Sequence, residues 1–112
     1  MGMEYHKFVH LFHIIIVGGL FFYVGINRDK TYAPILNAML YLGMIIIAYH
    51  IYKAYGYAKQ DKSYWVNLFH IFIVGPILLL IGYNGEKTSR KYFELLLMLA
   101  FASIGYHAYY LF

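Results

Sequence analysis

The sequence predicts an all-α integral membrane protein, a four-helix bundle made of two tandem helical hairpins that repeat each other in parallel. Composition is the first observation behind this prediction: 62% of the 112 residues are hydrophobic and 12% are charged. Soluble domains contain about 45–50% apolar and about 25% charged residues. A small domain has too high a ratio of surface to volume to bury this much apolar area. A bilayer would instead serve as its solvent.

Four long apolar runs are the second observation. They cover residues 8–26, 34–57, 64–83 and 92–112, and the linker 58–63 divides the chain into halves. At about 1.5 Å per residue, even the shortest run spans roughly 28 Å, close to the hydrocarbon thickness of a bilayer. Backbone groups in lipid must be paired within the segment, so each run is expected to be a helix. Residues 1–112 are predicted to form a single transmembrane domain.

The residues at the joints and along the runs support the same helices. Short polar turns at 27–30 and 84–87 separate the first helix from the second and the third from the fourth. Pro34 falls in the first turn of the second helix, where proline is favoured. Pro76 is expected to kink the third helix, because proline lacks the backbone N–H that the Phe72 carbonyl would accept. Lysine and arginine lie almost equally on both sides, so the positive-inside rule does not fix the orientation.

An internal repeat is the third observation. A shift of 57 residues aligns 8–55 with 65–112 without a gap, and 18 of the 48 aligned positions are identical. The identities include Leu-Phe-His-Ile at 11–14 and 68–71, and Tyr-His-x-Tyr at 49–52 and 106–109. Each repeat would cross the membrane twice, so the repeats are expected to be parallel. Glycines spaced by seven along the first and third helices are expected to form a packing seam: Gly18, Gly25, Gly75 and Gly82.

Two histidines recur at matching positions of both repeats, within the apolar runs. His13 and His70 fall near the starts of the first and third helices, and His50 and His107 fall near the ends of the second and fourth. Because the helices of a hairpin are antiparallel, all four side chains are expected at similar depth near one face of the membrane. Ionisable residues inside a membrane span are costly and raise the hypothesis of a functional site.

Several interpretations of this four-histidine layer remain open. Four imidazoles could ligate a transition metal such as zinc or copper. A diagonal pair, His13 with His70 or His50 with His107, could ligate haem b through both axial positions. A ring of histidines could also serve a proton relay or a small ion channel, which a homo-oligomer would form. The structural alternative is that each histidine only hydrogen-bonds a neighbour.

Residues near the histidines extend the candidate site. Gly43 and Ala100 lie seven residues before His50 and His107, where a small side chain leaves room for a bound group or for close approach of another helix. The tyrosines that precede these two histidines, Tyr49 and Tyr106, could hydrogen-bond them or relay radicals, but anchoring at the membrane interface is the favoured interpretation. Fourteen residues after His13 and His70, Asn27 and Asn84 suggest a polar stripe that faces the interior.

A second histidine cluster is predicted on the first helix alone. His6, His10 and His13 lie on one face at spacings of four and seven residues, and two histidines at a spacing of four can bind a metal. Ser63 and Asn67 occupy the corresponding places of the second repeat. Because the cluster is not duplicated, a polar cluster at the membrane interface is favoured over a metal site.

The repeated motif at 68–76, together with Gly105-Tyr106-His107-x-Tyr109, resembles short multi-span proteins encoded by large DNA viruses of algae and protists. The resemblance implies a viral or host membrane, and no activity. The absence of cysteine excludes thiolate chemistry, and no hydrolase motif is present. A net charge of +4 without a clustered basic face fits membrane lipids as partners and not nucleic acid. We therefore expect a binding or membrane-organising protein and not a hydrolytic enzyme.

Overall fold

The computed structural model describes residues 2–111 and the side chains from residue 7 to residue 111. Within this range the chain is helical and contains no strand. The α-helices are α1 (Gly2–Phe12), α2 (Gly18–Asn27), α3 (Ala33–Lys59), α4 (Trp65–Phe69), α5 (Gly75–Asn84) and α6 (Arg90–Leu111). The prediction of an all-α fold is confirmed.

These elements form four long helical segments. The segments are Lys7–Lys30, Ala33–Lys59, Trp65–Lys87 and Arg90–Leu111, and each is long and apolar enough to cross a membrane. The four predicted helices are therefore confirmed, with boundaries that differ from the predicted ones by a few residues. Pro34 lies in the first turn of α3, as predicted, where its missing N–H disrupts no helical hydrogen bond.

The first and third segments each contain a π-helical turn. One turn covers His13–Val17, between α1 and α2, and the other covers His70–Val74, between α4 and α5. The sequence predicts an interruption at Pro76 only, yet the first segment has the same turn with Gly19 in place of the proline. The interruption therefore does not depend on proline. Single π-turns inside α-helices often occur at functional sites, and both of these begin at a histidine.

The same backbone reversal ends the first and the third segments. Arg28 has φ 52° and Gly85 has φ 57°, and a short 3₁₀ turn begins at each of these residues. Glycine adopts this conformation without steric cost, whereas arginine, with ψ −125°, lies outside the left-handed helical region that other residues tolerate and is strained. Arg28 and Gly85 are 57 residues apart, so the turns follow the spacing of the sequence repeat.

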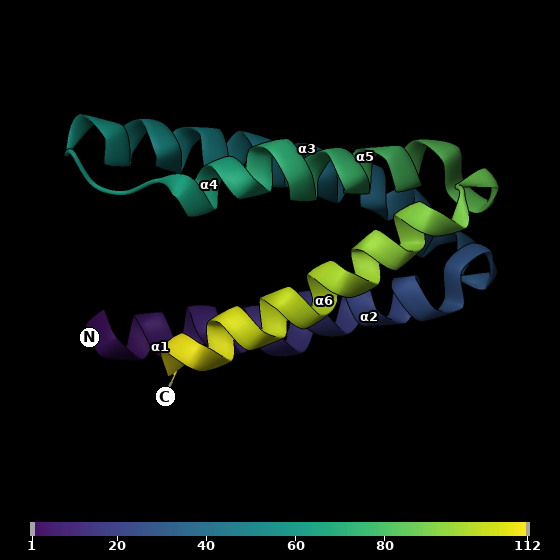
Figure 1. Ribbon diagram of the computed structural model, residues 1–112, viewed down its shortest axis with the longest axis horizontal. Coiled ribbons are helices and arrows are strands. Elements are labelled where there is room, and N and C mark those ends of the chain that lie inside the picture. The colour runs from purple at the N-terminus through teal and green to yellow at the C-terminus, as the bar shows by residue number, and fades with distance from the viewer. Residues whose placement is uncertain (1, 112) are drawn as a thin grey trace. The chain divides into compact units, whose positions relative to one another are not determined.

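The helices pack as two compact units, which we call unit 1 and unit 2. Unit 1 contains the chain up to Arg28 and from Ser89 onward, and unit 2 is Asp29–Thr88. In unit 1, α2 packs against α6; in unit 2, α5 packs against α3 (Figure 1). Each unit thus combines one helical segment of the first sequence repeat with one of the second.

Matching residues form the core of each unit. In unit 1 the buried large side chains of α2 and α6 are Phe21, Val24, Phe93 and Leu96, and in unit 2 those of α5 and α3 are Leu78, Ile81, Leu36 and Met39. Every residue of the first set has its counterpart 57 residues away in the second. The two units are therefore built on one packing pattern.

Glycines bring the paired helices into close contact. A Cβ added to Gly25 would lie 3.0 Å from the Cα of Leu97, and one added to Gly82 would overlap the backbone of Leu40. Gly18 and Gly75 face Ile104 and Ile47 in the same manner. The predicted glycine seam is confirmed as a packing surface. Residue numbers rise along one helix of each contact and fall along the other, so the paired helices in each unit are antiparallel.

Large apolar side chains cover the outside of the helices. In each segment, only 17–28% of the most apolar window is buried within the protein. Exposed side chains include Phe8, Ile15, Tyr41, Ile45, Phe72, Met98 and Phe101, each more than half exposed. Soluble monomers rarely expose so much contiguous apolar surface.

Candidate functional site

The histidines of the first and third segments are held by their own helices. The Nδ1 of His13 lies 2.8 Å from the carbonyl oxygen of Val9, and the Nδ1 of His70 lies 2.8 Å from that of Val66. Helical side chains lean toward the N-terminus, so a ring nitrogen reaches the carbonyl four residues earlier. A carbonyl only accepts, so Nδ1 carries the proton in both rings. In the neutral ring, Nε2 is then unprotonated.

Each of these rings stacks on a histidine from the partner helix. The ring centroids of His13 and His107 are 4.3 Å apart with 22° between the ring planes, in unit 1. Those of His50 and His70 are 4.1 Å apart with 16° between the planes, in unit 2. All four side chains are half-buried. The structure therefore places one histidine pair in each unit, which we call the unit 1 pair and the unit 2 pair.

A third polar side chain contacts each pair, and here the two units differ. In unit 2, the Nδ1 of His50 donates to the Oδ1 of Asn67 at 2.8 Å, and Asn67 is buried. In unit 1, the Nδ1 atoms of His10 and His107 lie 2.9 Å apart. One of these two nitrogens donates and the other accepts, so at least one ring is neutral. His10 and Asn67 occupy matching positions of the repeat.

The diagonal pairings predicted for haem b are not tested by the contacts within a unit and stay predictions. His13 and His70 belong to different units, and so do His50 and His107. The pairs in contact are instead His13 with His107 and His50 with His70. Their rings stack at van der Waals distance, so a porphyrin has no room between them.

Tyr49 and Tyr106 also lie beside the pairs, whereas Gly43 and Ala100 are placed in the contact between helices. The rings of Tyr49 and Tyr106 are each 5.2 Å from the ring of the following histidine, edge to face. A Cβ on Gly43 would meet the carbonyl oxygen of Gly75 at 3.1 Å, so the space at Gly43 is occupied by the partner helix. Ala100, its counterpart in unit 1, is fully buried. Of the two predicted roles for these small residues, close helix approach is the one the structure supports at Gly43.

The remaining candidates do not join the histidine pairs. Asn27 donates to the carbonyl of Tyr23 at 2.8 Å, on its own helix. Asn84 is exposed at the end of α5. At about 1.5 Å per residue, each asparagine lies roughly 21 Å along the helix from its histidine. The side chain of His6 lies outside the described residues.

Two polar residues of the site were not among the candidates. Asn67 accepts the hydrogen bond from His50, and its position 57 residues after His10 was the available signal. Ser103 donates to the carbonyl oxygen of His13 at 3.3 Å, where the π-turn begins. Ile46 stands at the position that matches Ser103, so the repeat gives no indication of this contact.

Within residues 7–111, no three side chains among histidine, aspartate and glutamate converge as a preformed metal site. Each histidine pair offers two imidazoles. A polar side chain hydrogen-bonds one of them, His10 to His107 in unit 1 and Asn67 to His50 in unit 2. No protein-family model, no curated protein and no solved structure matches this chain.

Proposed function

We propose that this chain is a multi-pass integral membrane protein that binds transition-metal ions at its two histidine pairs, one ion in each unit. The membrane is that of a virus or its host, as the sequence resemblance implies. Four long apolar helical segments and their largely exposed apolar side chains support the membrane setting. Recurrence of one packing pattern at a spacing of 57 residues supports an origin by tandem duplication.

The observation that carries the proposal is the matched hydrogen bond of His13 to Val9 and of His70 to Val66. Histidines that ligate a metal usually donate their other ring N–H to a carbonyl, a carboxylate or water, which fixes the tautomer and the ring orientation. Here the Nδ1 proton is held by a carbonyl, so Nε2 is the nitrogen that would ligate. The same bond occurs at the same length in both units.

The second histidine of each pair is supported in the same way. Asn67 accepts from the Nδ1 of His50, which again leaves Nε2 as the ligating nitrogen. His10 takes this place beside His107. Two neutral imidazoles suit zinc and copper, and solvent or an added ligand would complete the coordination. Zinc requires Zn–N distances of about 2.0–2.1 Å with both lone pairs directed at the ion, so binding would turn the two rings of a pair out of their stacked arrangement.

Metal analysis of the full chain, purified in detergent, tests this proposal. We expect two Zn²⁺ ions per chain at saturation by calorimetric titration with elemental analysis. His13→Gln and His70→Gln are each expected to leave one ion per chain, since each variant removes a ligand from one unit. His10→Gln is the matched control: it removes a histidine that contacts a ligand but is not one itself, and its amide oxygen can still accept from His107, so we expect two ions per chain. Wild-type protein that binds no Zn²⁺ or Cu⁺ stoichiometrically would overturn the proposal.

Proton transfer is a second candidate function, and the contact between His10 and His107 favours it. Two imidazoles joined at 2.9 Å can exchange the roles of donor and acceptor. Proteoliposomes with a pH-sensitive dye inside test this function. A proton flux that His10→Asn abolishes would support it, and no flux above that of empty liposomes would exclude it.

A further inference from the structure

The packed segments of unit 1 are not neighbours in the chain, whereas those of unit 2 are. In unit 2, residues 60–64 join the second segment directly to the third. In unit 1, the first segment packs against the fourth, although the whole of unit 2, Asp29–Thr88, separates them in the sequence (Figure 1). The first segment can therefore leave the fourth, and be replaced by the same segment of another copy, while unit 2 stays intact.

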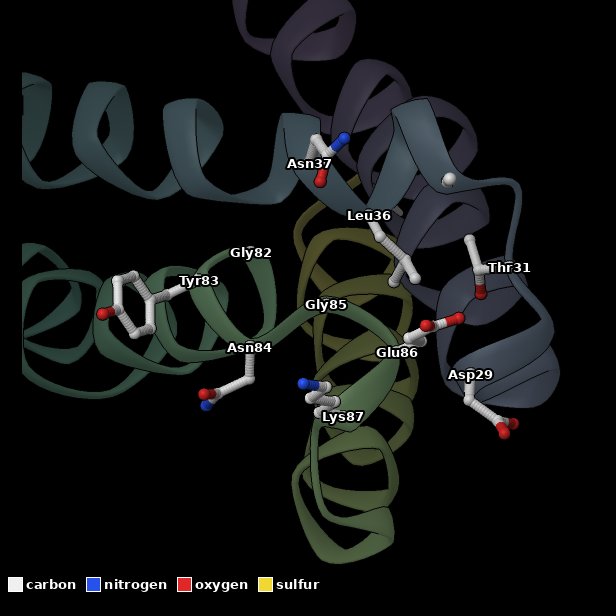
Figure 2. A pocket seen from close by; sticks show the side chains of 11 residues that line it. Asp29, Thr31, Leu36, Asn37, Gly82, Tyr83, Asn84, Gly85, Glu86 and Lys87 are labelled. Atoms are coloured by element: carbon white, nitrogen blue, oxygen red, sulfur yellow. The ribbon is translucent and has the colours of Figure 1, made fainter.

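A strained connection joins the first segment to unit 2. Arg28, the last residue of the first segment in unit 1, has φ 52° and ψ −125°, a conformation that residues other than glycine rarely adopt. Figure 2 shows Asp29 and Thr31 on this connection, which leads into the start of α3. Thr31 is buried, whereas Asp29 and Lys30 are exposed, so Arg28–Lys30 is the part that can change its conformation, and we call it the hinge. Short connections under strain favour the exchange of segments between copies.

The corresponding connection between the third and fourth segments has neither weakness. Gly85 stands where the hinge has Arg28, and glycine adopts the same backbone conformation without steric cost. The hydroxyl of Thr88 donates to the carbonyl oxygen of Gly85 at 2.6 Å. The Oγ1 of Thr31, the counterpart of Thr88, makes no hydrogen bond within residues 7–111. The comparison of the two connections therefore indicates that the first segment is the one exchanged, while the fourth stays in place.

A second copy of this chain offers the fourth segment the same packing surface. Exchange of the first segments between two copies restores every contact of unit 1, such as that of Gly25 with Leu97. Two copies with the same orientation in one membrane present their first segments in the same direction, so the antiparallel packing is kept. Because an exchange of this kind needs no new interface, it is a low-cost route to a dimer. Relief of the strain at Arg28 then favours the dimer over the closed monomer, in which unit 1 forms within one chain.

We propose that this chain forms a dimer by exchange of its first segment, with the hinge as the point of opening. In each unit 1 of the dimer, the first segment of one copy packs against α6 of the other. His13 of one copy then pairs with His107 of the other, so the two copies share each unit 1 pair. The exchange rests on the membrane setting of the proposed function, and the shared site rests in addition on the proposed metal binding.

Disulfide cross-linking tests the exchange without metal. The chain contains no cysteine, and a Cβ at Gly25 would lie 3.0 Å from the Cβ of Leu97, slightly less than the mean of about 3.8 Å in disulfides. Gly25→Cys and Leu97→Cys chains with different tags are co-expressed and oxidised in the membrane, and we expect a linked dimer of one chain of each kind. Gly19→Cys replaces Gly25→Cys in the matched control, because no atom lies within 4 Å of its Cβ, and we expect no such dimer. Equal linkage in both combinations, or none in either, overturns the proposal.

Complementation between histidine variants tests the shared site and replaces no glycine. His13→Gln and His107→Gln chains, each with its own tag, are co-expressed and purified through both tags. The mixed dimer would contain one intact unit 1 pair, so we expect three Zn²⁺ ions for two chains, two of them at the unit 2 pairs. Recovery of no mixed dimer, or of one with only two ions, overturns the proposal. If wild-type protein binds no Zn²⁺, only the metal site fails, and the cross-linking still decides the exchange.

Arg28→Gly tests the role of the strained hinge. Glycine adopts this backbone conformation freely, so the closed monomer gains stability relative to the dimer. We expect the dissociation constant of the dimer, measured by analytical ultracentrifugation in detergent, to rise at least about tenfold. Arg28→Lys is the matched control, because it keeps both the positive charge and the strain, and we expect an unchanged dissociation constant. If Arg28→Gly has no greater effect than Arg28→Lys, strain at the hinge does not drive the exchange.

Discussion

Replacement of Gly82 by alanine is expected to lower the free energy of unfolding by about 3 kcal/mol, the upper range for an overpacked core. The added Cβ would overlap the backbone nitrogen and Cα of Leu40, and no rotation of a side chain can relieve that clash. Helix α5 would have to move away from α3, which removes the contacts of Leu78 and Ile81, both fully buried. Thermal or denaturant unfolding of detergent-purified protein measures the loss.

Other glycines provide graded controls for this variant. Gly25→Ala is expected to cost less, because its nearest neighbour would be 3.0 Å from the new Cβ. Gly19→Ala places its Cβ where no atom lies within 4 Å, and alanine is the better helix former by about 0.5–1 kcal/mol. We therefore expect Gly19→Ala to be neutral or stabilising. Equal stabilities of the Gly82→Ala and Gly19→Ala proteins would show that the close approach of α5 and α3 does not hold unit 2 together.

Much of the fold could be predicted because it depends on local patterns. The apolar runs are long enough to identify each helix, and the polar turns at 27–30 and 84–87 mark where helices end. The seven-residue spacing of Gly18 and Gly25 identifies the face of α2 that packs. The π-turns could not be predicted, because the turn at His13–Val17 forms without a proline to indicate it.

The pairing of the histidines could not be predicted, and the repeat itself is the reason. The first and third segments carry the same glycine seam, so either one could pack against either of the other two segments. Sequence therefore shows that His13 and His70 are equivalent, but not that His13 meets His107. The role of Asn67 depends on the same choice, because it contacts His50 only when the second and third segments pack together.

The second prediction with a large effect concerns Asn67, the residue that accepts a hydrogen bond from the unit 2 pair. Asn67→Leu is expected to weaken Zn²⁺ binding by unit 2 about 10- to 100-fold, the usual loss when the group that orients a metal ligand is removed. Leucine matches asparagine in size but cannot accept the proton of the His50 Nδ1. The measurement is a Zn²⁺ titration in a background with His6→Gln, His10→Gln, His13→Gln and His107→Gln, which removes the unit 1 pair and the histidines beside it.

Unit 1 allows the converse experiment, because His10 stands where unit 2 has asparagine. In a background with His50→Gln and His70→Gln, we expect His10→Leu to weaken Zn²⁺ binding by the same factor. His10→Asn is expected to retain it, because the amide oxygen accepts from His107 as Asn67 does from His50. If His10→Asn loses as much affinity as His10→Leu, then His10 is itself a ligand and the two sites differ in chemistry. If neither variant changes the affinity for Zn²⁺, the hydrogen bond between His10 and His107 serves packing and does not orient a metal ligand.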